Sequence, residues 1–222
     1  MTPSAFIQDL AALRFPGAFN PYAESCPDCD GAEAPRVRRE NLRLVLEAAL
    51  SKGVDSIWIA RDLGYRGGRR TGLDLTDEAH LTAHASLYGS LPLARATRGP
   101  IVTERTAKVV WQILSGVGRP VFLWNVFPLH PHGSAGPLSN RCHNRSEREA
   151  SRHFLEWLVA EFRPKTLIAI GRDAEAALAE LGAKAERVRH PSYGGQGEFL
   201  ARMSELYGLP TGAINQAQLT MI

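Results

Sequence analysis

Three polar side chains stand where apolar stretches of the sequence end, and their chemistries are complementary. Asp62 closes IWIARD, Asn125 closes PVFLWN, and His190 follows ERVR. A carboxylate can orient water or stabilise positive charge, an imidazole can donate a hydrogen bond, and an amide offers both a donor and an acceptor. If the apolar stretches are parallel strands, their carboxyl ends share one edge of a sheet. We therefore expect the three side chains to share one site.

The apolar stretches alternate with helix-like segments along the chain. Strands are predicted over 57–62, 120–126, 166–170 and 186–189, and helices over 4–14, 35–52, 77–88, 103–116, 146–162, 172–181 and 196–207. Ser146 and Glu149 have the spacing of a capping box that opens one of these helices. Strands that alternate with helices are typical of α/β folds. We expect a three-layer αβα fold with a central, mainly parallel four-stranded sheet.

The chain of 222 residues has the length of one domain, and we expect a single domain over 1–222. Residues 1–53 precede the first strand and are expected to form an N-terminal helical cover, whereas 210–222 read as a weakly ordered tail. Three cysteines are too few for a disulfide framework. No apolar run approaches the roughly 18 residues that a membrane span requires. These features favour a cytoplasmic protein.

The overall charge gives no argument for nucleic-acid binding, because 26 Lys and Arg residues face 23 Asp and Glu residues for a formal net charge of +3. Locally, however, arginines and glycines crowd the segment after the first strand: Arg61, Arg66, Arg69, Arg70, Gly64, Gly67, Gly68 and Gly72. A basic, glycine-rich loop at a strand end can hold a phosphate, although such clusters also form ordinary solvated surfaces.

The strand-end residues lie in segments that resemble the motifs of the uracil-DNA glycosylase superfamily. Ala60-Arg61-Asp62-Leu63-Gly64 stands where the family has its first motif. Asn125, in LWNVFPLHP, corresponds to the recognition asparagine, and His190-Pro191-Ser192, in RHPSYGGQ, to the final motif. Between them, SNRCHNRSEREASRHFLEWL and LIAIGRDA also resemble family segments. The resemblance covers about residues 54–208.

This resemblance implies a glycosylase that extrudes uracil, or another deaminated or modified base, from DNA, hydrolyses its N-glycosidic bond and initiates base excision repair, with DNA containing uracil or a related damaged base as its partner. Asp62 would be the catalytic carboxylate, His190 would donate a hydrogen bond to the base carbonyl, and Asn125 would read the edge of uracil. Arg61, Gly64 and Leu75 would complete the base pocket. Leu75 would replace a stacking aromatic residue. Gly64 would replace a bulky tyrosine, which implies a roomier pocket.

The DNA strand would be contacted from two segments of the chain. The expected contact residues are Gly67, Gly68, Arg69, Arg70, Ser192, Tyr193 and Gly194. Glycine amides and arginines suit a phosphate, and Tyr193 is a candidate wedge in place of the family's intercalating leucine.

No cofactor or metal is expected. The iron–sulfur branch of the family has four ligand cysteines, whereas this chain offers only Cys26-x-x-Cys29 and a distant Cys142. Other functions stay open at this point. Asp62 can instead cap a helix or pair with Arg61, and the altered first motif also suits a non-catalytic binder of damaged or single-stranded DNA. An enzyme acting on a free nucleoside or nucleotide is a third possibility.

Overall fold

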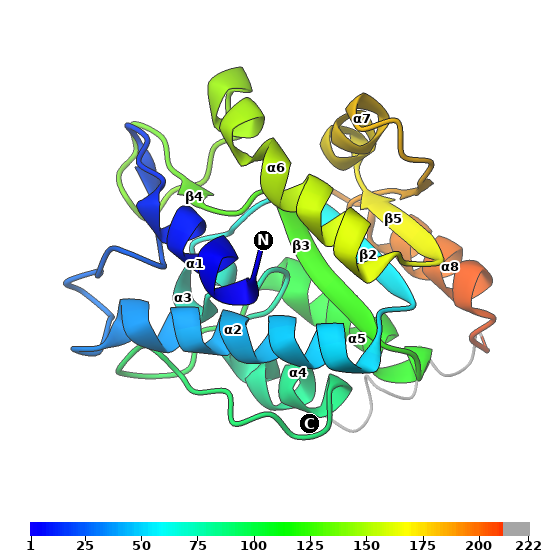
Figure 1. The fold of residues 1–222 in the computed structure, drawn as a ribbon, viewed down its shortest axis with the longest axis horizontal. Coiled ribbons are helices and arrows are strands. Elements are labelled where there is room, and N and C mark those ends of the chain that lie inside the picture. Colours follow the sequence, from blue (N-terminus) through cyan, green and yellow to red (C-terminus); the bar gives the residue numbers. More distant parts are fainter. Residues whose placement is uncertain (211–222) are drawn as a thin grey trace.

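The computed structural model describes residues 1–210, and the predicted tail therefore lies almost wholly outside the described residues. Its centre is a parallel sheet of four strands, β2 (Ser56–Asp62), β3 (Val121–Phe127), β5 (Thr166–Ile170) and β6 (Glu186–Val188), in the order β3-β2-β5-β6. Helices cover the sheet on both sides (Figure 1). The predicted three-layer αβα fold is confirmed.

The order of the strands creates a switch point beside β2. The chain runs from β2 to β3 on one side, and β5 then returns to pair with the other side of β2. Ala60 pairs with Asn125 across the first of these contacts, and Ile59 pairs with Ala169 across the second. In open parallel sheets, ligands bind beyond the carboxyl ends of the strands at such a switch point.

Alternate side chains of the strands enter two separate cores. Ile57 and Ile59 of β2, with Trp124 of β3, face the core that is covered by α1 (Pro3–Ala12), α2 (Ala34–Lys52), α6 (Arg145–Phe162) and α7 (Arg172–Glu180). From α1, the Phe6 ring packs against the Trp124 ring at a centroid distance of 5.4 Å. The two N-terminal helices thus bury apolar side chains against the sheet.

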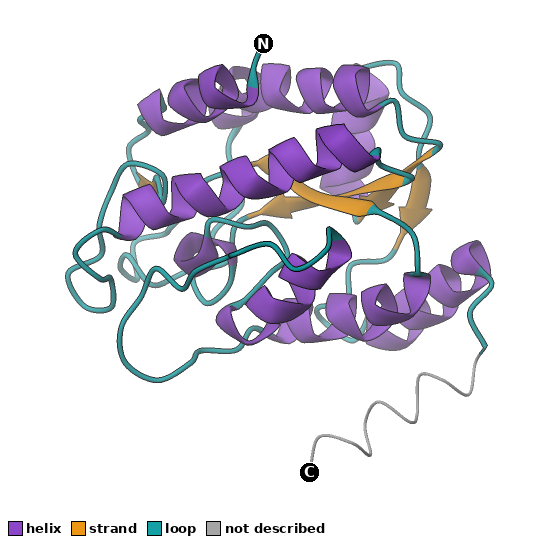
Figure 2. Ribbon diagram, turned by 60° about the horizontal axis from the view of Figure 1, so that its bottom comes forward, coloured by secondary structure: helices purple, strands orange, loops and turns teal. Residues whose placement is uncertain are grey.

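The opposite face of the sheet buries Trp58 and Ala60 of β2 with Leu123 of β3. This face is covered by α5 (Arg105–Val117) and α8 (Gln196–Tyr207). Figure 2 shows the sheet between the two groups of helices. Because β2, β3 and β5 are buried on both faces, they read as nearly continuous apolar runs in the sequence, whereas β6 buries only Val188.

The connections differ more from the predictions than the strands do. The glycine-rich segment contains the short helix α3 (Gly68–Thr71), and the helix predicted over 77–88 is divided into a 3₁₀ turn, η1 (Glu78–His80), and α4 (Leu81–Leu87). A small antiparallel sheet of β1 (Ala18–Phe19) and β4 (His130–Pro131) was not predicted. Strands of two residues carry no periodic signal.

The capping box of α6 is also shifted from its predicted position. The Asn144 side chain accepts a hydrogen bond from the Glu147 backbone N–H at 2.9 Å, and the Glu147 side chain accepts one from the Asn144 N–H at 2.7 Å. The prediction of Ser146 and Glu149 was wrong because the same spacing recurs two residues earlier.

Within residues 1–210, the helices are all too short or too polar to cross a membrane.

Candidate active site

A pocket of about 400 Å³ opens beyond the carboxyl ends of the strands. Its wall includes the three strand-end residues Asp62, Asn125 and His190. Six other residues predicted for the site also line it, namely Arg61, Gly64, Gly68, Leu75, Ser192 and Tyr193. The structure therefore brings most of the predicted site residues to one cavity at the switch point of the sheet.

Asp62, at the end of β2, is held by two donors. Arg61 Nε donates to Oδ2 at 2.7 Å, and His143 Nδ1 lies 2.5 Å from Oδ1. Because a carboxylate oxygen only accepts, the proton of this second bond belongs to His143 Nδ1. The Asp62 side chain is buried at the pocket wall, with 6% of its surface exposed. Its orientation is fixed from both sides.

His143 is placed by the loop that leads into α6. Next to it, Asn144 forms the capping box described above. Arg141 donates to both carboxylate oxygens of Glu147, at 2.8 and 2.5 Å, and to the Gly17 carbonyl at 2.9 Å. These contacts tie the loop to the first turn of α6 and to the N-terminal segment, so that His143 is held against Asp62.

His190 follows β6, and its tautomer can be assigned from its neighbours. The Ser192 backbone N–H lies 3.2 Å from Nδ1, which must accept this bond. The proton of the neutral imidazole is therefore on Nε2. Burial, and after it the charge of Arg61, lowers the pKa of His190 to about 4. The ring is neutral near pH 7 and can offer an Nε2–H donor.

Asn125 is buried on β3 beside a second buried carboxyl group, that of Asp74. Burial raises the pKa of Asp74 to about 8, and hydrogen bonding from Asn125 opposes this rise. Geometrically, Asp74 Oδ1 and Oδ2 and Asn125 Oδ1 lack well-aligned partners among residues 1–210. A protonated Asp74 can donate to Asn125 Oδ1, whereas an ionised Asp74 can only accept. The protonation of Asp74 therefore bears on how the Asn125 amide is turned.

The space next to Gly64 is occupied by Glu104, the residue before α5. A Cβ atom added to either Gly64 or Gly67 would overlap the Glu104 carboxylate. This finding corrects the expectation that Gly64 simply leaves a roomier pocket, because a carboxylate from a distant segment fills part of the space.

Leu75, at the predicted stacking position, lies in the left-handed region with a φ of 53°. Its carbonyl accepts from Trp111 Nε1 at 3.1 Å.

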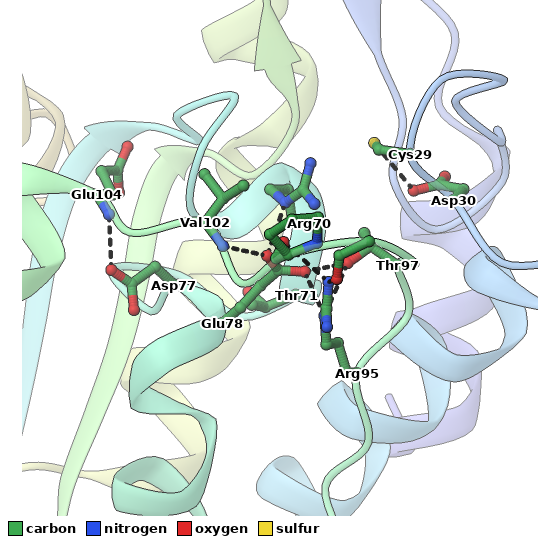
Figure 3. Close-up of polar contacts among 12 residues, drawn as sticks. Cys29, Asp30, Arg70, Thr71, Asp77, Glu78, Arg95, Thr97, Val102 and Glu104 are labelled. Carbon is green, nitrogen blue, oxygen red and sulfur yellow. Dashed lines mark hydrogen bonds and ion pairs between the residues drawn. The ribbon is translucent and has the colours of Figure 1, made fainter.

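Arg69 and Arg70 point into the protein, which corrects their predicted role in binding phosphate. The Arg69 guanidinium lies 3.9 Å from the centre of the Phe19 ring and donates to the Pro137 carbonyl at 2.5 Å. Arg70 forms an ion pair with the buried carboxylate of Glu78 at 3.1 Å. Figure 3 shows Arg70 in the group of residues around Glu78. Both arginines stabilise the fold around the pocket.

Of the remaining residues predicted to contact DNA, some are bonded within the protein and others are exposed to solvent. The Gly67 amide donates to the Gly64 carbonyl at 3.2 Å within its own turn, so it is not available to a phosphate. Tyr193, in contrast, is 98% exposed at the rim of the pocket, with a φ of 51°. Gly194 follows it on the same exposed loop, also at positive φ. The loop after His190 therefore faces solvent, whereas the glycine-rich segment is mostly buried.

Several residues at or beside the pocket were not predicted as parts of the site, and the three that bear most on its chemistry are Asp74, Glu104 and His143. Each reaches its position through tertiary contacts between segments that are distant in the sequence. Glu104 directly precedes α5, and a glutamate at a helix start gives no sign in the sequence that it reaches a pocket. His143 lies in the segment SNRCHN, which resembles a family segment, but its spacing in the sequence gives no sign of a contact with Asp62.

Comparisons with known proteins agree with this fold. Residues 80–210 match the family described as the uracil DNA glycosylase superfamily, and the chain therefore belongs to this superfamily. Among solved structures, it is similar to SMUG2 of Pedobacter heparinus, with a TM-score of 0.58 and 14% sequence identity over 94% of this chain and 98% of that one. No curated protein matches the sequence. The matched residues begin after the first motif, so Asp62, Gly64 and Leu75 lie outside them.

Proposed function

We propose that the protein is a monofunctional DNA glycosylase that hydrolyses the N-glycosidic bond of uracil, or of a related deaminated or modified base, and so initiates base excision repair. The observation that carries this proposal is the convergence of Asp62, Asn125 and His190 on one pocket of about 400 Å³. This volume lies within the range of small-ligand sites. DNA is the proposed partner, and the low cysteine content suggests a cytoplasmic location.

The base side of the pocket supplies what a leaving base requires. As the bond breaks, the base takes up the bonding electrons and leaves as an anion. The Nε2–H of neutral His190 would donate to the carbonyl oxygen where this charge develops, and Arg61 adds a positive charge at the same wall. Asn125 would hold the edge of the base, because its amide can both donate and accept.

The sugar side requires a negative charge and a water molecule. The Asp62 carboxylate would stabilise the positive charge that builds on the sugar and would orient the water that attacks it. Its two hydrogen bonds, from Arg61 and His143, fix the direction in which the carboxylate points. A carboxylate that is already held in the reactive geometry lowers the activation barrier more than one that must first be ordered.

The test is base release from a uracil-containing oligonucleotide, followed by alkaline cleavage of the abasic product. We expect cleavage with the wild type and a loss of roughly a hundredfold or more in Asp62→Asn, since comparable groups contribute that much in other enzymes. Glu161→Gln, on the exposed end of α6, removes the same charge far from the pocket and serves as the control. No release by the wild type from any common lesion would overturn the proposal.

A non-catalytic binder of damaged or single-stranded DNA is the second candidate. Two observations favour it: both oxygens of Asp62 already accept hydrogen bonds, and Leu75 stands where a stacking ring is expected. Fluorescence anisotropy with labelled oligonucleotides distinguishes the two functions. Tight binding of uracil DNA without release would favour the binder, whereas release that depends on Asp62 would exclude it.

A further inference from the structure

Glu104 brings a second carboxylate to the wall of the pocket that holds Asp62. Its main chain is anchored, because Asp77 Oδ2 accepts from the Glu104 N–H at 2.7 Å and the Glu104 carbonyl accepts from Lys108 N–H at 3.0 Å. Figure 3 shows this bond to Asp77 and shows the Glu104 carboxylate pointing away from it. The side chain therefore extends from a fixed point.

The Glu104 carboxylate has no hydrogen-bond or ion-pair partner in the part of the chain that the structure describes. A glutamate that precedes a helix can cap it, but Glu104 makes no such bond. Instead the carboxylate fills the space that side chains on Gly64 and Gly67 would take. Two glycines that follow β2 thus make room for a carboxylate without a hydrogen-bond partner among residues 1–210. The side chain is half-buried on the pocket wall, so its candidate partners are water in the pocket and a ligand group that replaces this water.

We propose that Glu104 is a specificity-determining residue, whose carboxylate contacts the extruded base and favours bases that present an N–H or O–H donor to it. This inference rests on the proposed function, since it assumes that the pocket takes a base. A carboxylate accepts such a donor with a strong, charge-assisted hydrogen bond. A base that presents a methyl group there would remove water from the carboxylate without replacing it, which is costly. The proposal therefore concerns the choice of base rather than the cleavage step.

The electrostatic surroundings of Glu104 support this role. Burial, and after it the negative charge of Asp77, raises the pKa of Glu104 to about 7, and Arg66 opposes the rise. A base without a donor would require Glu104 to be protonated, whereas a donor-bearing base would stabilise the ionised form. Preference for donor-bearing bases should hence increase as pH rises from 6 to 8. Asp77 and Arg66 act on it directly, and the other charged or titratable groups of the pocket wall are Arg61, Asp62, Arg141, Arg172, Asp173 and His190.

The test compares bases that differ in the donor they carry. Oligonucleotides with uracil, thymine, 5-hydroxymethyluracil or hypoxanthine are tested under single-turnover conditions with the wild type, Glu104→Gln and Glu104→Leu. For Glu104→Leu we expect the rate on 5-hydroxymethyluracil or hypoxanthine, whichever the wild type prefers, to fall about tenfold or more relative to the rate on uracil. The difference in rate between uracil and thymine should become smaller. Glu104→Gln should abolish the dependence of this preference on pH. Glu161→Gln should change neither quantity.

Two outcomes would overturn the proposal. One is an equal fall of the single-turnover rate on all four bases in Glu104→Leu, which would indicate a structural role. Thermal melting of both variants would show whether the fold is destabilised. The other is an unchanged preference. The affinities of Asp62→Asn and of the double variant Asp62→Asn, Glu104→Leu for the same oligonucleotides measure the preference for each base without base release. A wild type that binds selectively but releases nothing would contradict the proposed glycosylase function and still decide the role of Glu104.

Discussion

At the level of single residues, burial decides which form of each titratable group the pocket presents. The same loss of water that lowers the pKa of His190 raises that of Asp74 and of Glu104. The result is a neutral imidazole donor, a carboxyl group that keeps its proton and a carboxyl group poised near pH 7. Near neutral pH, Asp74 and Glu104 therefore retain protons that carboxyl groups with ordinary pKa values release, whereas the ring of His190 stays neutral to lower pH than usual.

The His190 imidazole should act in its neutral form over a wide pH range. Its pKa is lowered to about 4, so protonation should begin only as pH falls below about 5. We expect the ratio of single-turnover rates, wild type over His190→Gln, to be constant between pH 5 and 8. Because other groups titrate equally in both proteins, the ratio isolates the histidine. A ratio that changes with a midpoint near 6.5 would contradict the neutral assignment.

Asp74 should make the stability of the fold dependent on pH. Its folded-state pKa is raised from 3.8 to about 8, so the folded protein holds a proton that the unfolded chain releases between these values. Stability is therefore lost as pH rises through this window, by up to about 1.4 kcal/mol per pH unit. Asp74→Asn cannot ionise and should stabilise the protein more at pH 8 than at pH 5. Urea unfolding at both pH values checks this, and equal effects would contradict it.

At the level of elements, the strands could be predicted and the connections could not. Residues such as Ile57 and Trp124 lie on strands covered on both faces, and their apolar runs are visible in any window of the sequence. Asp62, Asn125 and His190 could then be placed together because parallel strands end at one edge. This inference needs only the order of the strands, not their side-chain packing.

The side-chain contacts made by the loops between strands and helices depend on tertiary structure, and local sequence patterns predicted them wrongly. Arg69 and Arg70 have the composition of a phosphate loop, but Arg69 packs on the ring of Phe19, which is distant in the sequence, and Arg70 pairs with Glu78 of the nearby turn η1. Glu78 accepts from the Val102 N–H at 2.7 Å and from Arg95 at 3.0 Å as well (Figure 3). A buried carboxylate with several donors can outcompete solvent for an arginine. No local pattern contains that information.

The start of α6 offers a test at this level. Asn144→Ala removes the capping side chain and should lower the free energy of unfolding by about 1 kcal/mol. Ser146→Ala, at the position that the sequence favoured, should cost less, because Ser146 only donates to Asn144 Oδ1 at 2.7 Å. Urea unfolding of the two variants makes the comparison. A larger loss in Ser146→Ala would contradict the capping box at Asn144 and Glu147.

At the level of the whole molecule, a modest net charge leaves the choice of DNA structure to local features. A formal net charge of +3 supplies only a weak overall attraction to a duplex. The feature at the pocket rim that can distinguish duplex from single strand is Tyr193. Its ring is 98% exposed, and the backbone there has a φ of 51°, which is rare for a residue with a side chain.

Tyr193 should matter more for duplex substrates than for single strands. Extruding a base leaves a gap in a duplex, and an aromatic ring inserted there would replace part of the lost stacking, which is worth about 1–3 kcal/mol per base. A single strand has no such gap. We expect Tyr193→Ala to lower base release from duplex DNA about tenfold and from the same single strand much less. Single-turnover rates on matched oligonucleotides measure both.

Tyr193→Phe supplies the control for this prediction, because it keeps the ring and removes only the hydroxyl group. We expect it to behave as the wild type on both substrates if stacking is the relevant interaction. Because the Tyr193 side chain is almost wholly exposed, neither variant should change the melting temperature by more than about a degree or two. Equal losses on duplex and single strand in Tyr193→Ala would show that the ring contacts the extruded nucleotide itself. The loop after His190 would then belong to the base pocket and not to the contact with the remaining duplex.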